Sequence, residues 1–144
     1  MRKIKYKADP SALWKSVARC TGFNDAEQTQ CALPGRLAWE ALKSGTADSN
    51  DIATMADVIA ICITAAQGMD DLVQDVCNAA RDALAEIADR FTRLQRWGVD
   101  ANALRDIPPV IDLYEELLRN ATGGQFEQWI GCVRTLKNRV ELTA

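Results

Sequence analysis

Apolar residues recur at helical spacing along this chain, and no alternating apolar–polar run predicts a strand. The clearest stripe follows Asp70 and Asp71, and its positions step by three or four residues. Its members are Val73, Val76, Ala80, Leu84, Ile87, Phe91 and Leu94. The pattern predicts a long amphipathic helix that ends at Gly98.

A second apolar segment, 52–66, is hydrophobic on nearly every side, which predicts a central, buried helix. Asp48 can cap its start, with Asp51 three residues on, and Gln67-Gly68 ends it. Because both this helix and the long one need cover from neighbours, we expect them to form the centre of the core.

Upstream, the pattern predicts two separate helices. Asn24 and Glu27 can cap a short helix in the irregular stretch 21–35. Pro34 then opens another helix, with Leu37 and Leu42 facing inward, and Gly45 ends it.

Downstream, Asp100 predicts a cap for a short turn, and Pro108-Pro109 begins a helix with Val110, Leu113, Tyr114, Leu117 and Leu118 inward. Thr122 and Gln125 have capping-box spacing before a last helix. Its apolar positions are Phe126, Trp129, Ile130, Val133, Leu136 and Val140.

These elements predict an all-α fold, a single compact bundle of about five to seven helices with one long central helix. The last four main helices are expected to form two antiparallel hairpins. Asp9-Pro10 is typical of a helix start. We therefore expect residues 1–8 to be a flexible basic arm and residues 9–144 to be one helical domain.

Charge is segregated along the chain. The formal charge of −3 divides into +4 for residues 1–7, −8 for residues 8–89 and +1 for residues 90–144. A basic arm on an acidic body indicates that the arm would meet any polyanion.

The 144 residues include no histidine, the usual general base and metal ligand near neutral pH. The five cysteines, at 20, 31, 62, 77 and 132, form no C-x-x-C motif. They are expected to be small hydrophobic residues in a reducing compartment, while a zinc site or disulfide framework is the alternative. We expect no enzyme, no catalytic residues, no metal site and no cofactor.

Acidic residues Asp82, Glu86 and Asp89 share one face of the long helix. A metal or acid/base role would need partners from other helices. The simpler interpretation is a solvated face on which Glu86 pairs with Arg90, and Asp89 with Arg93, each four residues on.

Two sets of residues are candidates for partner binding. The first is the N-terminal arm, where four cations and an aromatic ring could contact phosphates and stack on a base; the alternative is a solubilising terminus. The second lies at the end of the long helix, where an Arg/Trp cluster could grip a partner; the alternative is a half-buried helix end. The residues are Arg2, Lys3, Lys5, Tyr6 and Lys7 in the arm, and Arg90, Arg93, Arg96 and Trp97 at the helix end.

The segment Leu37-Ala-Trp-Glu-Ala-Leu-Lys-Ser-Gly45, with the capped apolar helix after it and the short basic arm before it, resembles small helical proteins of proteobacterial phages and prophages. These proteins are mostly uncharacterised. The resemblance covers residues 1–7 and 36–67 and implies an accessory protein that acts on a host macromolecule.

We therefore expect a non-catalytic protein that binds a host protein or nucleoprotein complex and modulates or inhibits it. The alternative is a nucleic-acid-binding transcriptional regulator that uses the basic arm; against it, the body is acidic and the isoelectric point is about 5.0. No signal core or membrane span is evident, so a cytoplasmic location in the host cell and no membrane partner are expected. The long apolar stripe fits a homodimer, or a monomer that covers the stripe itself.

Overall fold

The computed structural model describes the backbone of residues 21–143 and the side chains of residues 21–136. Those residues are all-α, as predicted, and hold six helices in the order α2 to α7. The helices are α2 (Asp25–Ser44), α3 (Ser49–Ala66), α4 (Asp71–Leu94), α5 (Ala101–Asp106), α6 (Pro108–Asn120) and α7 (Gly123–Thr143). In this range the only pairing of strand type is an isolated bridge between Gly22 and Thr122.

The predicted caps are present. Asp48 and Asp51 form a reciprocal capping box on α3. Thr122 and Gln125 form the same arrangement where α7 begins. Each box satisfies backbone N–H groups that the first helical turn leaves without partners, so these polar residues fix where the helices start.

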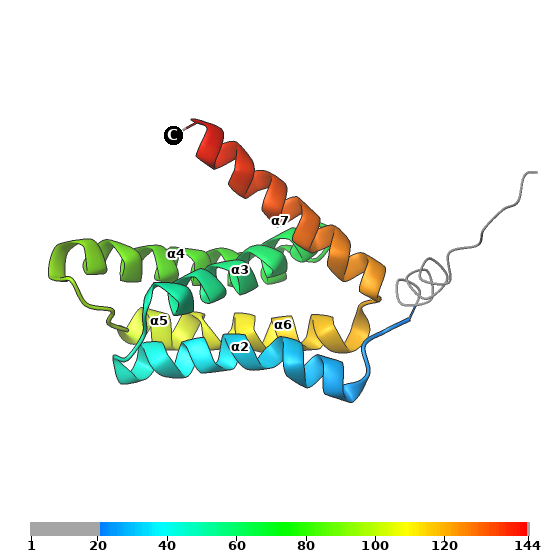
Figure 1. Cartoon of the computed structure of the whole chain (residues 1–144), viewed down its shortest axis with the longest axis horizontal. Helices are drawn as coiled ribbons and strands as arrows, with labels where there is room; N and C mark the ends of the chain where they lie inside the picture. The colour runs from blue at the N-terminus through cyan, green and yellow to red at the C-terminus, as the bar shows by residue number, and fades with distance from the viewer. Residues whose placement is uncertain (1–20, 144) are drawn as a thin grey trace, which may run out of the picture.

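The central helix is α3, as its apolar composition predicts. It contacts α2, α4, α6 and α7, and Figure 1 shows α3 and α4 lying above the layer formed by α2 and α6. Gly35 of α2 lets the two helices approach closely, because a Cβ at that position would lie 3.2 Å from Cγ2 of Val58.

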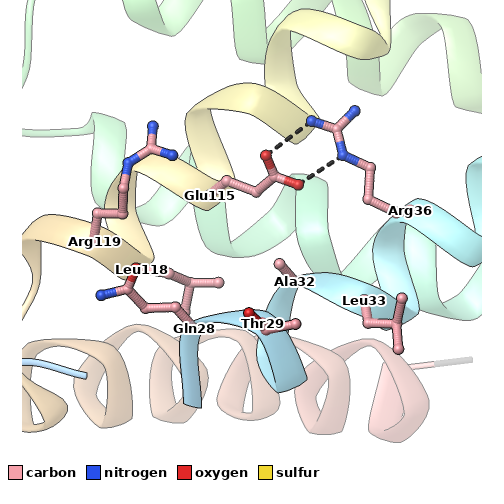
Figure 2. A pocket seen from close by; sticks show the side chains of 8 residues that line it. All are labelled: Gln28, Thr29, Ala32, Leu33, Arg36, Glu115, Leu118 and Arg119. Carbon is pink, nitrogen blue, oxygen red and sulfur yellow. Dashed lines mark hydrogen bonds and ion pairs between the residues drawn. The ribbon is translucent and has the colours of Figure 1, made fainter. Parts of the chain in front are cut away.

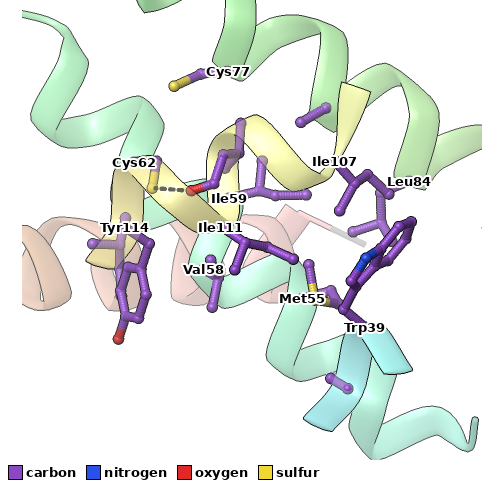
Figure 3. Packing of buried hydrophobic residues seen from close by; sticks show 14 of the residues in the cluster. Trp39, Met55, Val58, Ile59, Cys62, Cys77, Leu84, Ile107, Ile111 and Tyr114 are labelled. Atoms are coloured by element: carbon purple, nitrogen blue, oxygen red, sulfur yellow. Dashed lines mark hydrogen bonds between the residues drawn. The ribbon is translucent and has the colours of Figure 1, made fainter. Parts of the chain in front are cut away.

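One apolar cluster draws buried residues from all six helices and includes no buried polar or charged side chain among residues 21–136. Figure 3 shows its centre, where Trp39, Met55 and Ile111 meet Ile59 and Leu84. Burying such side chains is worth roughly 1.5–3 kcal/mol each, which makes this cluster the main source of stability.

Pro34 does not open a new helix, contrary to the prediction. It lies inside α2, which starts earlier at the Asn24–Glu27 capping box and runs without a break to Ser44. Proline removes the hydrogen bond to the carbonyl of Gln30. Gln30 and Pro34 are both exposed, so water can hydrate that carbonyl and the helix tolerates the loss. Leu37, predicted to face inward, is also exposed.

The second predicted hairpin is also wrong. α3 and α4 pack against each other, but α7 leaves its joint with α6 and crosses α3 instead (Figure 1). The apolar face of α6 is already covered by α2, α3 and α4. Phe126 and Val133 of α7 are buried in the same cluster as α3, whose apolar surface extends nearly all round.

α4 ends at Leu94, four residues before the predicted stop at Gly98. Gln95 takes the left-handed conformation there, at φ 57°, and its side chain donates to the carbonyl of Thr92 at 3.2 Å. The middle of the predicted stripe is buried, at Ala80, Leu84 and Ile87. Val76 and Leu94, towards its two ends, are exposed instead.

Candidate interaction site

The predicted Arg/Trp cluster at the end of α4 divides into structural and exposed residues. Arg90 does not pair with Glu86: its Nη1 donates to Oδ2 of Asp100 at 2.9 Å and its Nη2 to the carbonyl of Gly98 at 3.4 Å. Its Nε is buried without a hydrogen-bond partner. Arg90 therefore closes the turn between α4 and α5, and this more distant contact takes the place of the local pair.

Trp97 is half-buried, in agreement with the alternative interpretation of a half-buried helix end. Its ring stacks on that of Phe91, with centroids 3.8 Å apart and planes 8° from parallel. This contact folds the segment after α4 back onto the helix, so the ring stabilises the turn.

Arg93 and Arg96 are exposed, and the ion pair predicted between Asp89 and Arg93 is present at 3.6 Å. The structure therefore leaves two arginines of this cluster at the surface. The arm candidates, Arg2, Lys3, Lys5, Tyr6 and Lys7, lie outside the described residues.

A different surface stands out on the first half of α4. Leu72 has 72% of its surface exposed, and Val76, one turn further on, is also exposed. With Ala79 they form one wall of an open groove of about 270 Å³, and Pro109 at the start of α6 lies on the other. We call this the α4 groove; Leu72, Asp75, Val76, Ala79, Asp106 and Pro109 line it.

Carboxylates run beside the apolar wall. Asp71, Asp75, Asp82 and Glu86 step by four, seven and four residues, so they share one stripe of α4 next to Leu72 and Val76. Asp82 has Arg81 at 3.5 Å, and Asp106 across the groove is held by Arg105 at 2.9 Å. Asp71, Asp75 and Glu86 have no ion pair among the described side chains.

Periodicity does not locate this groove, because it shows which positions share a face and not how far neighbouring helices cover that face. Val76 belongs to the predicted stripe, and Leu72 stands outside it. The available signal is the acid row at Asp71 and Asp75 directly beside two large apolar residues. The acidic stretch Asp82–Glu86–Asp89 is exposed, as the solvated-face interpretation predicted.

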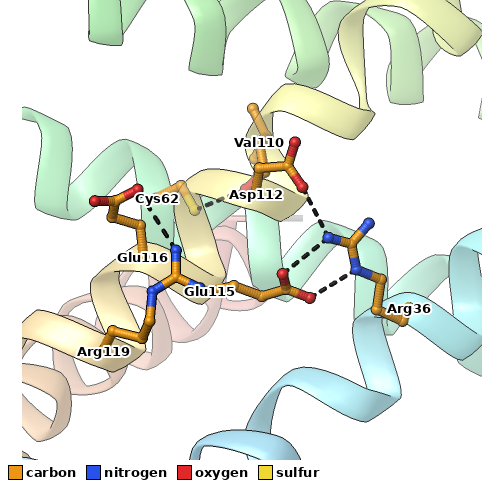
Figure 4. A network of polar contacts seen from close by, with 7 residues as sticks. All are labelled: Arg36, Cys62, Val110, Asp112, Glu115, Glu116 and Arg119. Atoms are coloured by element: carbon orange, nitrogen blue, oxygen red, sulfur yellow. Dashed lines mark hydrogen bonds and ion pairs between the residues drawn. The ribbon is translucent and has the colours of Figure 1, made fainter.

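A second hollow of about 310 Å³ lies between α2 and α6. Figure 2 shows its lining, with Arg36 and Leu33 towards one end, Arg119 and Leu118 towards the other, and Glu115 directed at Arg36. Its strongest polar groups are directed at each other: Arg36 binds Glu115 and Asp112, and Arg119 lies 3.6 Å from Glu116 (Figure 4). The Arg36 contacts join α2 to α6 through Nε and Nη2.

Buried thiols behave as the sequence predicted. Cys62 and Cys77 are buried in the core, and desolvation raises the pKa of each thiol. The Cys62 Sγ donates weakly to the carbonyl of Val110 at 3.7 Å. Because the thiolate is the reactive form, these two cysteines are packing residues. Cys31 is half-buried and Cys132 exposed, and Cys20 lies outside the described residues.

Among the side chains of residues 21–136, no three His, Cys, Asp or Glu residues gather in a group that could hold a metal ion. One helix in this range, α3, is long and apolar enough to cross a membrane, with a mean hydropathy of 1.3. Seven of its residues, Met55 and Cys62 among them, are buried in the bundle, so here α3 is a core helix.

The chain matches no known protein-family model, no curated protein and no solved structure.

Proposed function

We propose that this chain is a non-catalytic accessory protein of phage or prophage type that binds a host protein or nucleoprotein complex and changes its activity. The observation that carries the proposal is the α4 groove, where exposed Leu72 and Val76 lie beside Asp71 and Asp75, which have no ion pair among the described side chains. Exposed apolar surface rimmed by polar groups is typical of protein–protein interaction sites.

The charge of this face favours a basic partner. Residues 8–89 carry a formal charge of −8, and the acid row on α4 concentrates part of it beside the groove. A surface of this kind attracts a complementary positive surface and speeds encounter. Nucleic-acid-handling proteins of a bacterial host present positive surfaces of this kind. A partner of that class agrees with a cytoplasmic site of action and with no membrane partner.

The alternative is a nucleic-acid-binding regulator. The exposed side chains of Arg93 and Arg96 favour it, as does the run of cations in residues 1–7. The engagement of Arg90 with Asp100 counts against a three-arginine surface.

Affinity capture from a proteobacterial lysate, followed by mass spectrometry, tests the proposal with two variants of equal net charge. The first is Asp71→Asn/Asp75→Asn/Glu86→Gln. The matched control is Asp25→Asn/Glu40→Gln/Glu116→Gln, in which Asp25, like Asp71, stands in the first turn of a helix.

We expect the wild-type chain and the control to retain a basic host protein that the α4 variant loses, since only the latter removes the acid row. Capture of the same proteins by all three chains would contradict the proposal. Retention of nucleic acid alone would favour the regulator.

A further inference from the structure

We propose that the α4 groove binds an amphipathic helix of a basic partner, with leucine-type side chains on one face and lysine or arginine beside them. The inference rests on the proposed function and specifies the partner and its mode of binding.

The form of the groove favours a helix over an extended peptide. A peptide that adds to a sheet needs an open strand edge, and residues 21–143 contain no strand. The backbone groups in the middle of α4 are already satisfied within the helix. Only side chains are offered to the partner, as in other helix-in-groove complexes.

The dimensions agree with this mode. Leu72 and Ala79 are seven residues apart, which is roughly 10 Å along a helix axis at 1.5 Å per residue. An amphipathic helix repeats its apolar side chains over the same interval, at i, i+3, i+4 and i+7. One or two leucines of a partner could therefore lie between Leu72 and Val76 on one wall and Pro109 on the other.

The carboxylates beside the groove favour basic residues on the partner helix. Asp71, Asp75, Asp82 and Glu86 extend over 15 residues of α4, roughly 22 Å, on one side of the apolar wall. Two described ion pairs lie at this surface, Arg81 with Asp82 and Arg105 with Asp106. The stripe thus keeps a net negative charge for cations spaced along a partner helix.

The same charges disfavour two other occupants. A second copy docked groove to groove would bring two acid rows together, and like charges repel. The basic segment 1–7 of this chain has its apolar residues at Met1, Ile4 and Tyr6, which do not make the i, i+3, i+4 and i+7 repeat of an amphipathic helix.

A synthetic 18-residue peptide tests the inference, with leucines at i, i+3, i+4 and i+7 repeats and lysines between them. Its control is a scrambled peptide of the same composition. Binding to the full chain is measured by fluorescence anisotropy at low and high salt, and circular dichroism checks that each variant is folded.

Leu72→Ser should weaken binding of the leucine–lysine peptide by roughly tenfold, because it removes the largest exposed apolar side chain of the groove. Leu94→Ser is the matched control: Leu94 is 58% exposed on the same helix, roughly 33 Å further along, and its replacement should change nothing. Asp71→Asn/Asp75→Asn/Glu86→Gln should weaken binding several-fold and reduce its salt dependence.

Four results would overturn the inference. They are equal binding of the peptide and its scrambled control, unchanged binding by Leu72→Ser, at least tenfold tighter binding after deletion of residues 2–7, and a dimer in light scattering that Leu72→Ser dissociates. The last two would assign the groove to the chain's own arm or to a second copy.

The failures are distinguishable. Suppose that Leu72→Ser and Asp71→Asn/Asp75→Asn/Glu86→Gln both bind the peptide as tightly as the wild type, and that the charge variant still loses its host protein in affinity capture. The helix inference is then wrong and the proposed function stands. If peptide binding follows the predictions but no host protein is captured, the groove does bind a basic amphipathic helix and the proposed function fails.

Discussion

Arg36 of α2 and Glu115 of α6 form a two-point ion pair across 79 residues of sequence: Nε lies 2.6 Å from Oε1 and Nη2 lies 2.8 Å from Oε2. The same guanidinium reaches Oδ1 of Asp112 at 2.7 Å (Figure 4). Hydrogen bonds to Glu115 and then Asp112 raise the pKa of Arg36 further above its ordinary value. The pair fixes how α2 lies against α6.

We predict that the coupling free energy between Arg36 and Glu115 is about 1 kcal/mol, because the geometry is bidentate but Arg36 is 41% exposed and water screens the charges. A double-mutant cycle with Arg36→Ala and Glu115→Ala, followed by urea denaturation, measures it. Arg119→Ala is the control, since its 3.6 Å contact with Glu116 lies within one exposed helix face and should contribute less. Additive destabilisation in the cycle would show that the pair does not join the helices.

A charge in the core should prevent folding. Ile59→Asp and Leu84→Asp each bury a carboxylate among apolar side chains, with no cation within the cluster. Leu72→Asp, on the surface of α4, should leave stability within about 0.5 kcal/mol of the wild type. Circular dichroism and thermal melting check this. A helical, cooperatively melting Ile59→Asp protein would contradict the core assignment.

Two helices end at a residue in the left-handed conformation, and we expect substitutions at these two residues to have opposite effects on stability. Gly45 closes α2 at φ 75°, so Gly45→Ala should destabilise the chain by about 1 kcal/mol. Gln95 closes α4 at φ 57°, where glycine avoids the steric cost, so Gln95→Gly should raise stability by up to about 1 kcal/mol, less the value of the Gln95 side-chain hydrogen bonds. Denaturant midpoints compare the two. The same sign for both would contradict this account.

Asp100 should make stability depend on pH. The Ala103 N–H, 2.9 Å from its Oδ1, and then the Arg90 guanidinium lower the pKa of this carboxyl. A pKa lowered on folding gives stability that is present above the unfolded value of about 3.9 and is lost as pH falls through the folded value. Asp100→Asn keeps the helix cap but removes the charge. The stability gap between wild type and Asp100→Asn should therefore be constant from about pH 5 to 8 and shrink below about pH 4.

Urea titrations at neutral pH and at about pH 3 measure that gap, and Arg90→Ala provides the control. Without the guanidinium, the gap at neutral pH should be smaller. A gap of the same size at both pH values would show that the charge of Asp100 does not contribute to stability.

Local chemistry makes much of this fold predictable. Asp48, Asp100 and Thr122 act on backbone groups within three residues, so sequence spacing alone places their helix starts. The burial of α3 follows from an apolar composition that only a core position can satisfy. These predictions need no information about neighbouring helices.

Apart from the early end of α4 at Gln95, the errors involve parts of the chain that the fold brings together. The local rule for Pro34 predicts a helix start, yet Gln30 and Pro34 are exposed and the packing of α2 outweighs that rule. Spacing alone pairs Arg90 with Glu86, but Asp100 offers a half-buried site that only the fold creates. The exposure of Leu72 depends on how far α5 and α6 extend along α4, which its own sequence neighbourhood does not specify.

The last prediction concerns polyanion binding by the N-terminal arm. Arg2, Lys3, Lys5 and Lys7 stand together before the first acid at Asp9, and residues 8–144 carry a net charge of −7. Deletion of residues 2–7 should therefore remove weak affinity for DNA and flatten its salt dependence, by roughly one unit of slope for each phosphate that the arm neutralises. The helical content should be retained, because the first helix cap is expected at Asp9 and the apolar cluster of α2 to α7 is untouched.

Fluorescence anisotropy with a generic DNA duplex, titrated with salt, measures the effect of the deletion on DNA binding. Arg93→Gln/Arg96→Gln is the companion variant, since these two arginines are exposed on the body. Equal affinity of the truncated and full chains for DNA would assign DNA binding to Arg93 and Arg96 in place of the arm. If neither chain binds DNA at low salt, the regulator hypothesis is wrong and the protein-partner proposal stands.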